Sequence, residues 1–318
     1  GIPLVIGLFA SHKRMAWALG VEDIDELATR IQGFLQMMQG PPEGLVNRLR
    51  TLGQLIPLSS FQSKTVQRAP CQDVVIEGDD VDLFKYPVIK CWPLDGGRYI
   101  TLPLVITKDP KTGVQNFGTY RMQVFDRNTT SHYRAGIEMG LDRLEVAVAL
   151  GGDPATIWTG SAPVPPGMDE MAVAGFIREE GVEMVKAKTC DLLVPAHAEI
   201  ILEGYVVLGE EREEGPFGDH TGYYSMEDPY PVFHVTTITQ RTNPISPTIK
   251  VTGNPRTAAH MAENIDLDLS AVLEGGMTYE EAADLLEAEL VAVLSGKPTS
   301  AELLGETEIT VSRTGLNL

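Results

Sequence analysis

The sequence lacks the cysteine pattern of a disulfide scaffold or a zinc site. Its 318 residues contain three cysteines, Cys71, Cys91 and Cys190, which lie far apart and form no Cys-x-x-Cys pair. This pattern favours reduced thiols and a cytoplasmic location. Cys190 has two interpretations, a nucleophile or a small buried hydrophobic residue, and the second is the more frequent role of an isolated cysteine.

Positive charge is also scarce. The chain has 25 Lys and Arg against 44 Asp and Glu, which gives a formal net charge of -19. This excess argues against a general nucleic-acid binder, which needs a basic surface, and against binding to an anionic membrane. Residues 263–318 hold twelve of the acidic residues and two of the basic ones. The asymmetry indicates that this tail is a separate unit.

Long hydrophobic runs and phosphate-binding glycine loops are missing as well. The sequence has neither a Gly-x-Gly-x-x-Gly fingerprint nor a Walker loop. The apolar opening segment, GIPLVIGLFA, is too short to span a bilayer and follows no basic region, so we expect a buried strand there. Because the first residue is Gly, we expect the natural N-terminus to be absent. The hydrophobic content of 43% is enough for a substantial core.

Periodicity predicts a mixed α and β protein. A helix should begin after Asp23, since apolar residues then recur at helical spacing, and a second should run from about Asp169 toward Lys186. Alternating or apolar runs predict strands, with a hairpin tip at 109–113 and two long strands at 199–209 and 232–240. DPATI and PVPPG are interpreted as loops, and the tail after Thr278 as mostly helical.

The stretch EGPFGDHTGYY, residues 214–224, lies on the connection between the two long strands. Two carboxylates, Glu214 and Asp219, flank a turn that contains two glycines and Pro216. When two acids lie close together, repulsion and burial raise the pKa of one, which can then donate a proton near neutral pH. The other interpretation is a solvated surface turn, and the residue types alone leave both open.

This stretch resembles the corresponding part of the UbiD-like decarboxylases, which use prenylated flavin mononucleotide. The resemblance extends over about residues 1–247 and includes further motifs in the family order. They are NFGTYRMQV (116–124), VALGGDPATIWTGSAPVP (148–165) with the following Asp169-Glu170, and DLLVPAHAEIILEG (191–204). It implies an α+β fold, a flavin-binding split β-barrel, followed here by a small mostly helical unit at residues 248–318.

The resemblance also implies roles for individual residues. Glu214, Arg121 and Asp219 match the acid–arginine–acid network of the family. Asp219 would be the proton donor, and Arg121 would hold the substrate carboxylate and tune Glu214. We therefore expect Arg121 to converge with both acids, beside a hollow wide enough for an isoalloxazine ring. The flavin would be the electron sink, so the protein would position the substrate and deliver a proton.

The remaining implied residues concern the cofactor. Asn116, Thr119, Arg121 and Glu170 would contact it, and Asn116 and Glu170 would ligate a divalent metal, Mn or Mg, with K as a possible further ion. The implied partners are a small carboxylic acid, a flavin prenyltransferase that supplies the cofactor, and further copies of the chain in a homo-oligomer.

The sequence departs from the family pattern in three places. Roughly ten residues that should carry a metal-binding histidine are absent between Thr130 and Ser131. His132 is a candidate replacement, although a surface or packing histidine is the more common case. A family segment before residue 1 and the C-terminal half of the family are absent too, so the resemblance is truncated at both ends.

The tail from about residue 250 resembles the C-terminal part of the altronate and galactarate dehydratases. His260, Asp266 and Asp268 are either ligands or part of a solvated helical linker. Three hypotheses follow. The chain is a UbiD-like carboxy-lyase acting on an unsaturated or aromatic acid, a subunit of a sugar-acid hydro-lyase, or an inactive truncated or chimeric protein.

Overall fold

The structure is a computed structural model that describes residues 11–38, 61–132, 142–162, 169–219 and 221–246. Contacts divide the chain into two units. The first comprises residues up to Pro216 and Met226–Lys250, and the second comprises Phe217–Ser225 with residues 251–318. The strand expected at 1–10, the loop at 163–167 and the whole tail from residue 248 lie outside the described residues.

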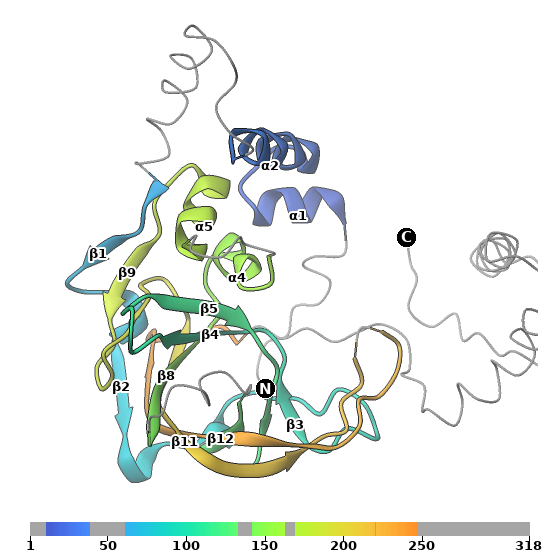
Figure 1. Cartoon of the computed structure of the whole chain (residues 1–318), viewed down its shortest axis with the longest axis vertical. Coiled ribbons are helices and arrows are strands. Elements are labelled where there is room, and N and C mark those ends of the chain that lie inside the picture. The colour runs from blue at the N-terminus through green and yellow to red at the C-terminus, as the bar shows by residue number, and fades with distance from the viewer. Residues whose placement is uncertain (1–10, 39–60, 133–141, 163–168, 220, 247–318) are drawn as a thin grey trace, which may run out of the picture. The chain divides into compact units, whose positions relative to one another are not determined.

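A curled antiparallel sheet dominates the first unit, and within the described residues it has nine strands (Figure 1). Along the sheet the order is β3 (Arg98–Ile100), β6 (Met122–Val124), β7 (Thr129–Ser131), β12 (Asp228–Gln240), β11 (Ile200–Glu214), β8 (Arg143–Leu150), β4 (Pro103–Lys108) and β5 (Gln115–Thr119). In addition, β2 (Val74–Glu77) pairs with β12. The predicted hairpin at 109–113 is confirmed, since it joins the paired strands β4 and β5.

Side chains of the central strands alternate between two hydrophobic cores. In β8, Ala147 and Ala149 enter one cluster, whereas Val146 and Val148 enter the other. The same alternation divides Ile201 from its neighbours Ile200 and Leu202 in β11. Successive residues of a strand point to opposite faces, so a strand that is buried on both faces reads as a nearly continuous apolar run. The run RLEVAVAL therefore forms the middle of the sheet.

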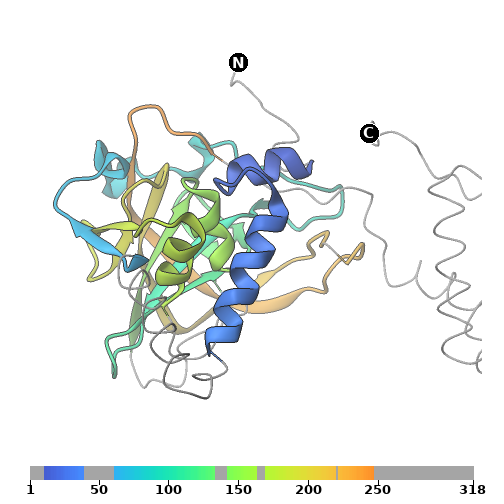
Figure 2. The same cartoon turned by 90° about the horizontal axis from the view of Figure 1, so that it is seen from above.

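A smaller sheet and a group of helices accompany the large sheet in the same unit. The small sheet has the order β1 (Lys64–Val66), β9 (Glu183–Lys186) and β10 (Leu193–Pro195). The helices α1 (His12–Ala18), α2 (Ile24–Met38), α4 (Pro154–Thr159) and α5 (Glu170–Arg178) lie together (Figures 1 and 2). They share a third apolar cluster. Short 3-10 turns occupy Pro70–Gln72, Gly78–Asp80 and Leu83–Lys85. None of the described helices is long and apolar enough to cross a membrane.

Two helix predictions need correction. The helix that begins after Asp169 ends at Arg178, because Glu179 adopts a left-handed conformation (φ 58°), and residues 183–186 form strand β9 instead. DPATI is not a loop but the first part of α4, with Asp153 as N-cap accepting from the Thr156 amide and Pro154 in the first turn. The helix after Asp23 is confirmed as α2, with the Asp23 carboxylate accepting from the Asp25 amide.

A buried carboxylate explains the sequence Leu-Glu-Gly at 202–204. Glu203 has no exposed surface and accepts hydrogen bonds from the amides of Lys188 (3.0 Å) and Thr189 (2.7 Å) and from the Thr189 hydroxyl (2.8 Å). The next residue must be glycine, because a Cβ at Gly204 would lie 1.8 Å from the carbonyl oxygen of His234 on the paired strand. Glu203 thus ties the loop between β9 and β10 to the large sheet.

Candidate active site

Arg121 and Glu214 form an ion pair in the first unit. The Arg121 Nε donates to Glu214 Oε1 at 2.8 Å, although the two residues are 93 positions apart. Arg121 lies between β5 and β6, and Glu214 is the last residue of β11. The Glu214 side chain is 3% exposed and the Arg121 side chain 24% exposed. Arg121 is therefore the member of the pair that reaches the surface.

The end of β11 is shaped by an irregularity in its pairing with β12. The register moves from Val206 opposite Phe233 to Glu211 opposite Pro231, so the intervening residues of β11 have no matching partners on β12. Gly209, within this bulge, has φ 89°, a conformation that favours glycine. Bulges bend a strand and change the direction of the side chains that follow. The regular pairing then resumes and ends at Glu214, opposite Asp228.

The backbone directly after Glu214 is held by buried polar groups. Gln123 Oε1 accepts from the Gly215 amide at 2.8 Å and from the Tyr99 hydroxyl, 3.1 Å away. The Pro216 carbonyl oxygen lies 2.7 Å from the Gly96 amide and 3.2 Å from the Tyr99 hydroxyl. Sequence reasoning missed Gln123 and Tyr99. The available signal was a polar residue, Gln123, within the apolar strand Met-Gln-Val two positions after Arg121.

Asp219 belongs to the second unit, of which Phe217–Ser225 is described apart from residue 220. This segment folds back on itself. The Ser225 amide donates to the Phe217 carbonyl (2.9 Å), and the Asp219 amide donates to the Tyr223 carbonyl (3.0 Å). Asp219 itself opens the turn, because its carbonyl accepts from the Gly222 amide. The convergence of Asp219 with Arg121 and Glu214 stays a prediction.

The three expected cofactor contacts other than Arg121 lie on β5 and at the start of α5. Asn116 is exposed on β5, and the alternation of the strand directs it to the face opposite Thr119. The Thr119 amide donates to Gly160 at the end of α4 (2.9 Å). Glu170 is the first residue of α5, and burial, followed by the charge of Asp169, raises the pKa of its carboxyl group.

The described residues contain no cluster of the side chains that most often ligate metals. Among them, no group of three or more His, Cys, Asp or Glu side chains is close enough to hold a metal ion. His132 is 2% exposed and its ring lies beside that of Phe233, with ring centroids 6.3 Å apart, which favours a packing role; its role as a replacement ligand stays a prediction. Thr130 and Ser131 are consecutive members of β7, paired in register with Phe233 and Val232.

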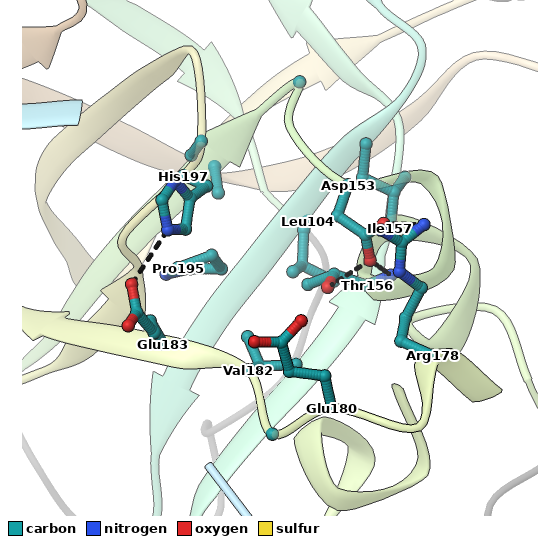
Figure 3. Close-up of a pocket in the computed structure, with 14 residues that line it drawn as sticks. Leu104, Asp153, Thr156, Ile157, Arg178, Glu180, Val182, Glu183, Pro195 and His197 are labelled. Atoms are coloured by element: carbon teal, nitrogen blue, oxygen red, sulfur yellow. Dashed lines mark hydrogen bonds and ion pairs between the residues drawn. The ribbon is translucent and has the colours of Figure 1, made fainter. Parts of the chain in front are cut away.

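A cavity of about 310 Å³ lies between α4, α5 and the small sheet (Figure 3). Asp153 and Arg178 form an ion pair of 3.0 Å on one side, and Glu183 and His197 lie 2.9 Å apart on the other. None of the six residues expected in the site lines this cavity. This cavity is therefore not the hollow expected beside Arg121, and that hollow stays a prediction.

Burial disfavours the reactive form of two cysteines, Cys71 and Cys190. Cys71, Cys91 and Cys190 are buried and form no disulfide, and burial raises the pKa of the Cys71 and Cys190 thiols to about 12, with a smaller contribution from the Glu203 carboxylate. The thiolate is the reactive form, and its fraction at pH 8 is on the order of a thousandfold below that of an ordinary cysteine. We expect Cys71 and Cys190 to react with a disulfide reagent at pH 8 only after denaturation, which thiol titration of native and unfolded protein measures. Rapid reaction of either residue in the native protein would contradict their burial.

A family profile matches most of the region that the structure describes. The profile described as the 3-octaprenyl-4-hydroxybenzoate carboxy-lyase Rift-related domain (UbiD) matches residues 64–255, more than half of the chain. The chain belongs to the UbiD family. The strand order of the large sheet, β11 and β12 included, and the Arg121–Glu214 pair all lie within the matched region.

Relatives of this UbiD chain are longer than the chain itself. It is 49% identical over 255 residues to an uncharacterized protein of Archaeoglobus fulgidus and 43% identical over 256 residues to one of Aquifex aeolicus. Each alignment covers 77% of this chain and 52% of the relative. The chain therefore spans about half the length of the curated relatives that it matches.

Solved structures confirm the split-barrel α+β fold. The UbiD-class enzyme HmfF from Pelotomaculum thermopropionicum, in complex with FMN, is 28% identical with a TM-score of 0.64, over 78% of this chain and 53% of that one. The vanillic acid decarboxylase of Sedimentibacter hydroxybenzoicus in its open form is 28% identical with a TM-score of 0.62, over 79% of this chain and 51% of that one.

A second profile matches the end of the chain. The D-galactarate/altronate dehydratase C-terminal profile covers residues 232–317, which include most of β12 and nearly all of the undescribed tail. The expected resemblance of the tail to this family is thus confirmed at the level of sequence. His260, Asp266 and Asp268 lie in the matched stretch but outside the described residues.

Proposed function

We propose that this UbiD chain is a non-oxidative carboxy-lyase for an unsaturated or aromatic carboxylic acid, with prenylated FMN as cofactor. The observation that carries the proposal is the part-buried Arg121–Glu214 pair at 2.8 Å, formed by the two members of the expected acid–arginine–acid network that lie in the same unit. HmfF, a structural neighbour, has been solved with prenylated FMN, which supports this choice of cofactor.

The two members of the pair differ in exposure, and we assign them different roles on that basis. The Arg121 side chain is 24% exposed and the Glu214 side chain 3%. The guanidinium group therefore meets the substrate carboxylate, since its planar fork suits a carboxylate. Glu214 lies behind it and orients the guanidinium through Nε. A bound carboxylate is held by this arrangement with its carbon–carboxylate bond in a fixed direction.

Proton delivery is assigned to Asp219. Loss of CO2 from a carboxylate leaves an electron pair on carbon, and one proton must replace the lost group. Asp219 gives that proton, forms the C–H bond and is reprotonated from solvent, so the overall reaction consumes one proton and releases one CO2. The reverse reaction, carboxylation, would use the same residues in the opposite order. Prenylated FMN, when bound, would supply the electron sink for this chemistry.

Two residues of β5 and α5, Asn116 and Glu170, would supply part of the ligand set of a divalent cation that helps to hold the cofactor. Glu170 is half-buried with a raised pKa, so a nearby cation would stabilise its charged form. Its carboxylate and the Asn116 amide oxygen are two hard oxygen ligands, suited to Mg or Mn that also binds phosphate and water. Thr119 is proposed as a further cofactor contact from the opposite face of the same strand. Potassium is proposed only as an accompanying ion, and a homo-oligomer as the working form.

Co-expression of the full 318-residue chain with a flavin prenyltransferase tests this function. We expect the purified protein to absorb as a modified flavin, to retain a divalent metal, and to release CO2 from an unsaturated or aromatic acid. In deuterated water the product should carry deuterium at the carbon that lost CO2. A colourless protein that releases no CO2 would overturn the proposal in favour of an inactive, chimeric chain.

Replacement of Asp219 by asparagine should slow decarboxylation by roughly 10²–10⁴-fold, because a positioned general acid contributes about that much. The flavin spectrum should stay unchanged, which separates proton delivery from cofactor binding. The matched control is Asp126→Asn, since Asp126 is a surface acid that pairs with Arg212. An Asp219→Asn protein with the full rate would remove Asp219 from the mechanism.

The dehydratase profile at residues 232–317 favours a second candidate, a subunit of a sugar-acid hydro-lyase. In that case the tail would act with a partner chain. Release of a 2-keto-3-deoxy acid from an aldarate by the purified protein, with no CO2 from any acid, would support this candidate over the first.

A further inference from the structure

Two buried polar residues hold the backbone next to Glu214. Neither belongs to the expected catalytic set. Tyr99 and Gln123 are direct cross-strand neighbours in β3 and β6, and both are buried, at 1% and 7% exposure. Cross-strand neighbours lie close enough for their side chains to interact. Here the hydroxyl and the amide oxygen are 3.1 Å apart.

The orientation of the Gln123 amide follows from its contacts. The Gly215 N–H, 2.8 Å from Oε1, can only donate, so the oxygen of the amide must face it. The amide nitrogen then faces Gly97, where an added Cβ would lie 2.9 Å from Nε2. Glycine at 97 thus leaves the space that the Gln123 amide occupies.

The Pro216 carbonyl is held by residues 96 and 99, which lie close to Gln123. It accepts from the Gly96 amide at 2.7 Å, and the Tyr99 hydroxyl lies 3.2 Å away. A Cβ at Gly96 would overlap the Gly215 carbonyl oxygen at 1.7 Å, so the two backbones touch and only glycine fits. Asp95, 2% exposed, accepts from the Trp92 amide at 2.8 Å and stabilises the turn that brings Gly96 there.

We propose that Gln123 and Tyr99 are positioning residues that keep Glu214 against Arg121 by fixing the Gly215–Pro216 backbone. The catalytic meaning of this proposal rests on the proposed decarboxylase function, but the positioning itself does not. Gln123 holds the amide directly after Glu214, so a shift there moves the Glu214 carboxylate relative to the guanidinium. The charge of Glu214 also reaches the Tyr99 ring. Burial, and after it that charge, raises the pKa of the Tyr99 hydroxyl.

The two residues should differ in importance. Gln123→Met removes the acceptor of the Gly215 amide while keeping a similar shape. Tyr99→Phe removes one hydroxyl but leaves two hydrogen bonds in place. They are the bond from the Gly96 amide to the Pro216 carbonyl and the bond from the Gly215 amide to Gln123 Oε1. We therefore expect Gln123→Met to lower kcat by roughly 10–100-fold with little change in KM, since small displacements of a catalytic group have effects of this size. Tyr99→Phe should lower kcat by roughly 3–10-fold, because a single neutral hydrogen bond is lost.

The first measurement needs no cofactor or activity. In apo protein labelled with ¹⁵N-arginine, the Arg121 Nε–H exchanges slowly with solvent when it is bonded to Glu214. Gln123→Met should increase this exchange rate at least tenfold, and Tyr99→Phe should increase it less. The chain offers a matched control in a second tyrosine–glutamine pair, where the Tyr86 hydroxyl donates to Gln240. Tyr86→Phe loses an equivalent bond and should leave the Arg121 signal unchanged.

The outcomes separate the two proposals. An unchanged Arg121 exchange rate in folded Gln123→Met protein overturns the positioning role, whatever the activity. If Gln123→Met does not fold, Tyr99→Phe decides in its place, by faster or unchanged exchange. Faster exchange in a protein that releases no CO2, even as wild type, supports positioning and overturns the decarboxylase function. An equal effect of Tyr86→Phe would assign the exchange rate to general stability and overturn the proposal.

Discussion

Replacing Arg121 by alanine should lower the free energy of unfolding by roughly 3–5 kcal/mol, the usual cost of removing one partner of a buried ion pair. The cause is Glu214, which is 3% exposed and would remain buried without the guanidinium that lies 2.8 Å from it. The same variant should lose decarboxylation, because the group assigned to the substrate carboxylate is gone. Urea denaturation of the variant and of the wild-type protein measures the stability difference.

Arg212→Ala is the control for this result. Arg212 is also 2.8 Å from a carboxylate, that of Asp126, but the two side chains are 50% and 61% exposed. Exposed pairs contribute up to about 1 kcal/mol, so this substitution should change stability only within that range. The two pairs share a distance and differ in burial. Equal costs in the two variants would show that Glu214 does not depend on Arg121 for its burial.

Replacing Glu203 by alanine should lower the free energy of unfolding by roughly 3 kcal/mol or more, since hydrogen bonds to a buried charged group are each worth about 1.5–3 kcal/mol. The Lys188 and Thr189 amides and the Thr189 hydroxyl, at 2.7–3.0 Å, would lose their acceptor. Because backbone amides cannot be removed, they must find water or stay unsatisfied. The loop between β9 and β10 should then exchange its amide hydrogens faster, which hydrogen-exchange mass spectrometry detects.

Glu145→Ala is the matched control, since Glu145 accepts from the Asp191 amide of the same loop at 2.8 Å but at an exposed position. Water can replace this acceptor, so stability should change by less than about 1 kcal/mol. A loop that stays protected in the Glu203→Ala protein would mean that its amides are satisfied by other groups.

Secondary structure was predicted best from the sequence where a local pattern coincides with a face that the fold buries. The two long strands around the acidic motif, the 109–113 hairpin and the Asp23 cap depend on neighbours in the chain, and all three are present. The predicted C-terminal end of the helix after Asp169 was wrong, because the apolar residues within 182–185 fit a helical repeat as well as a strand. Their pairing with β1 and β10, which lie elsewhere in the sequence, decides for the strand.

The candidate site shows the same limit. Arg121 and Glu214 were found through a resemblance of motifs, not through periodicity, and they are 93 residues apart. Gln123 and Tyr99 were not found, because their partners are two backbone groups, the Gly215 amide and the Pro216 carbonyl. Backbone groups leave no side-chain signature, so a single sequence cannot indicate which of them a buried glutamine will meet.

The pairing of β12 has a consequence for the newly synthesised chain. One edge of β12 carries both β2 and β7, and the other carries β11, so a single strand near residue 240 joins segments that begin at residue 74. Until the ribosome has released that strand, three earlier strands have open hydrogen-bonding edges, which invite association with other chains. We expect the nascent protein to depend on chaperones until β12 emerges, and to acquire protease resistance abruptly once it does.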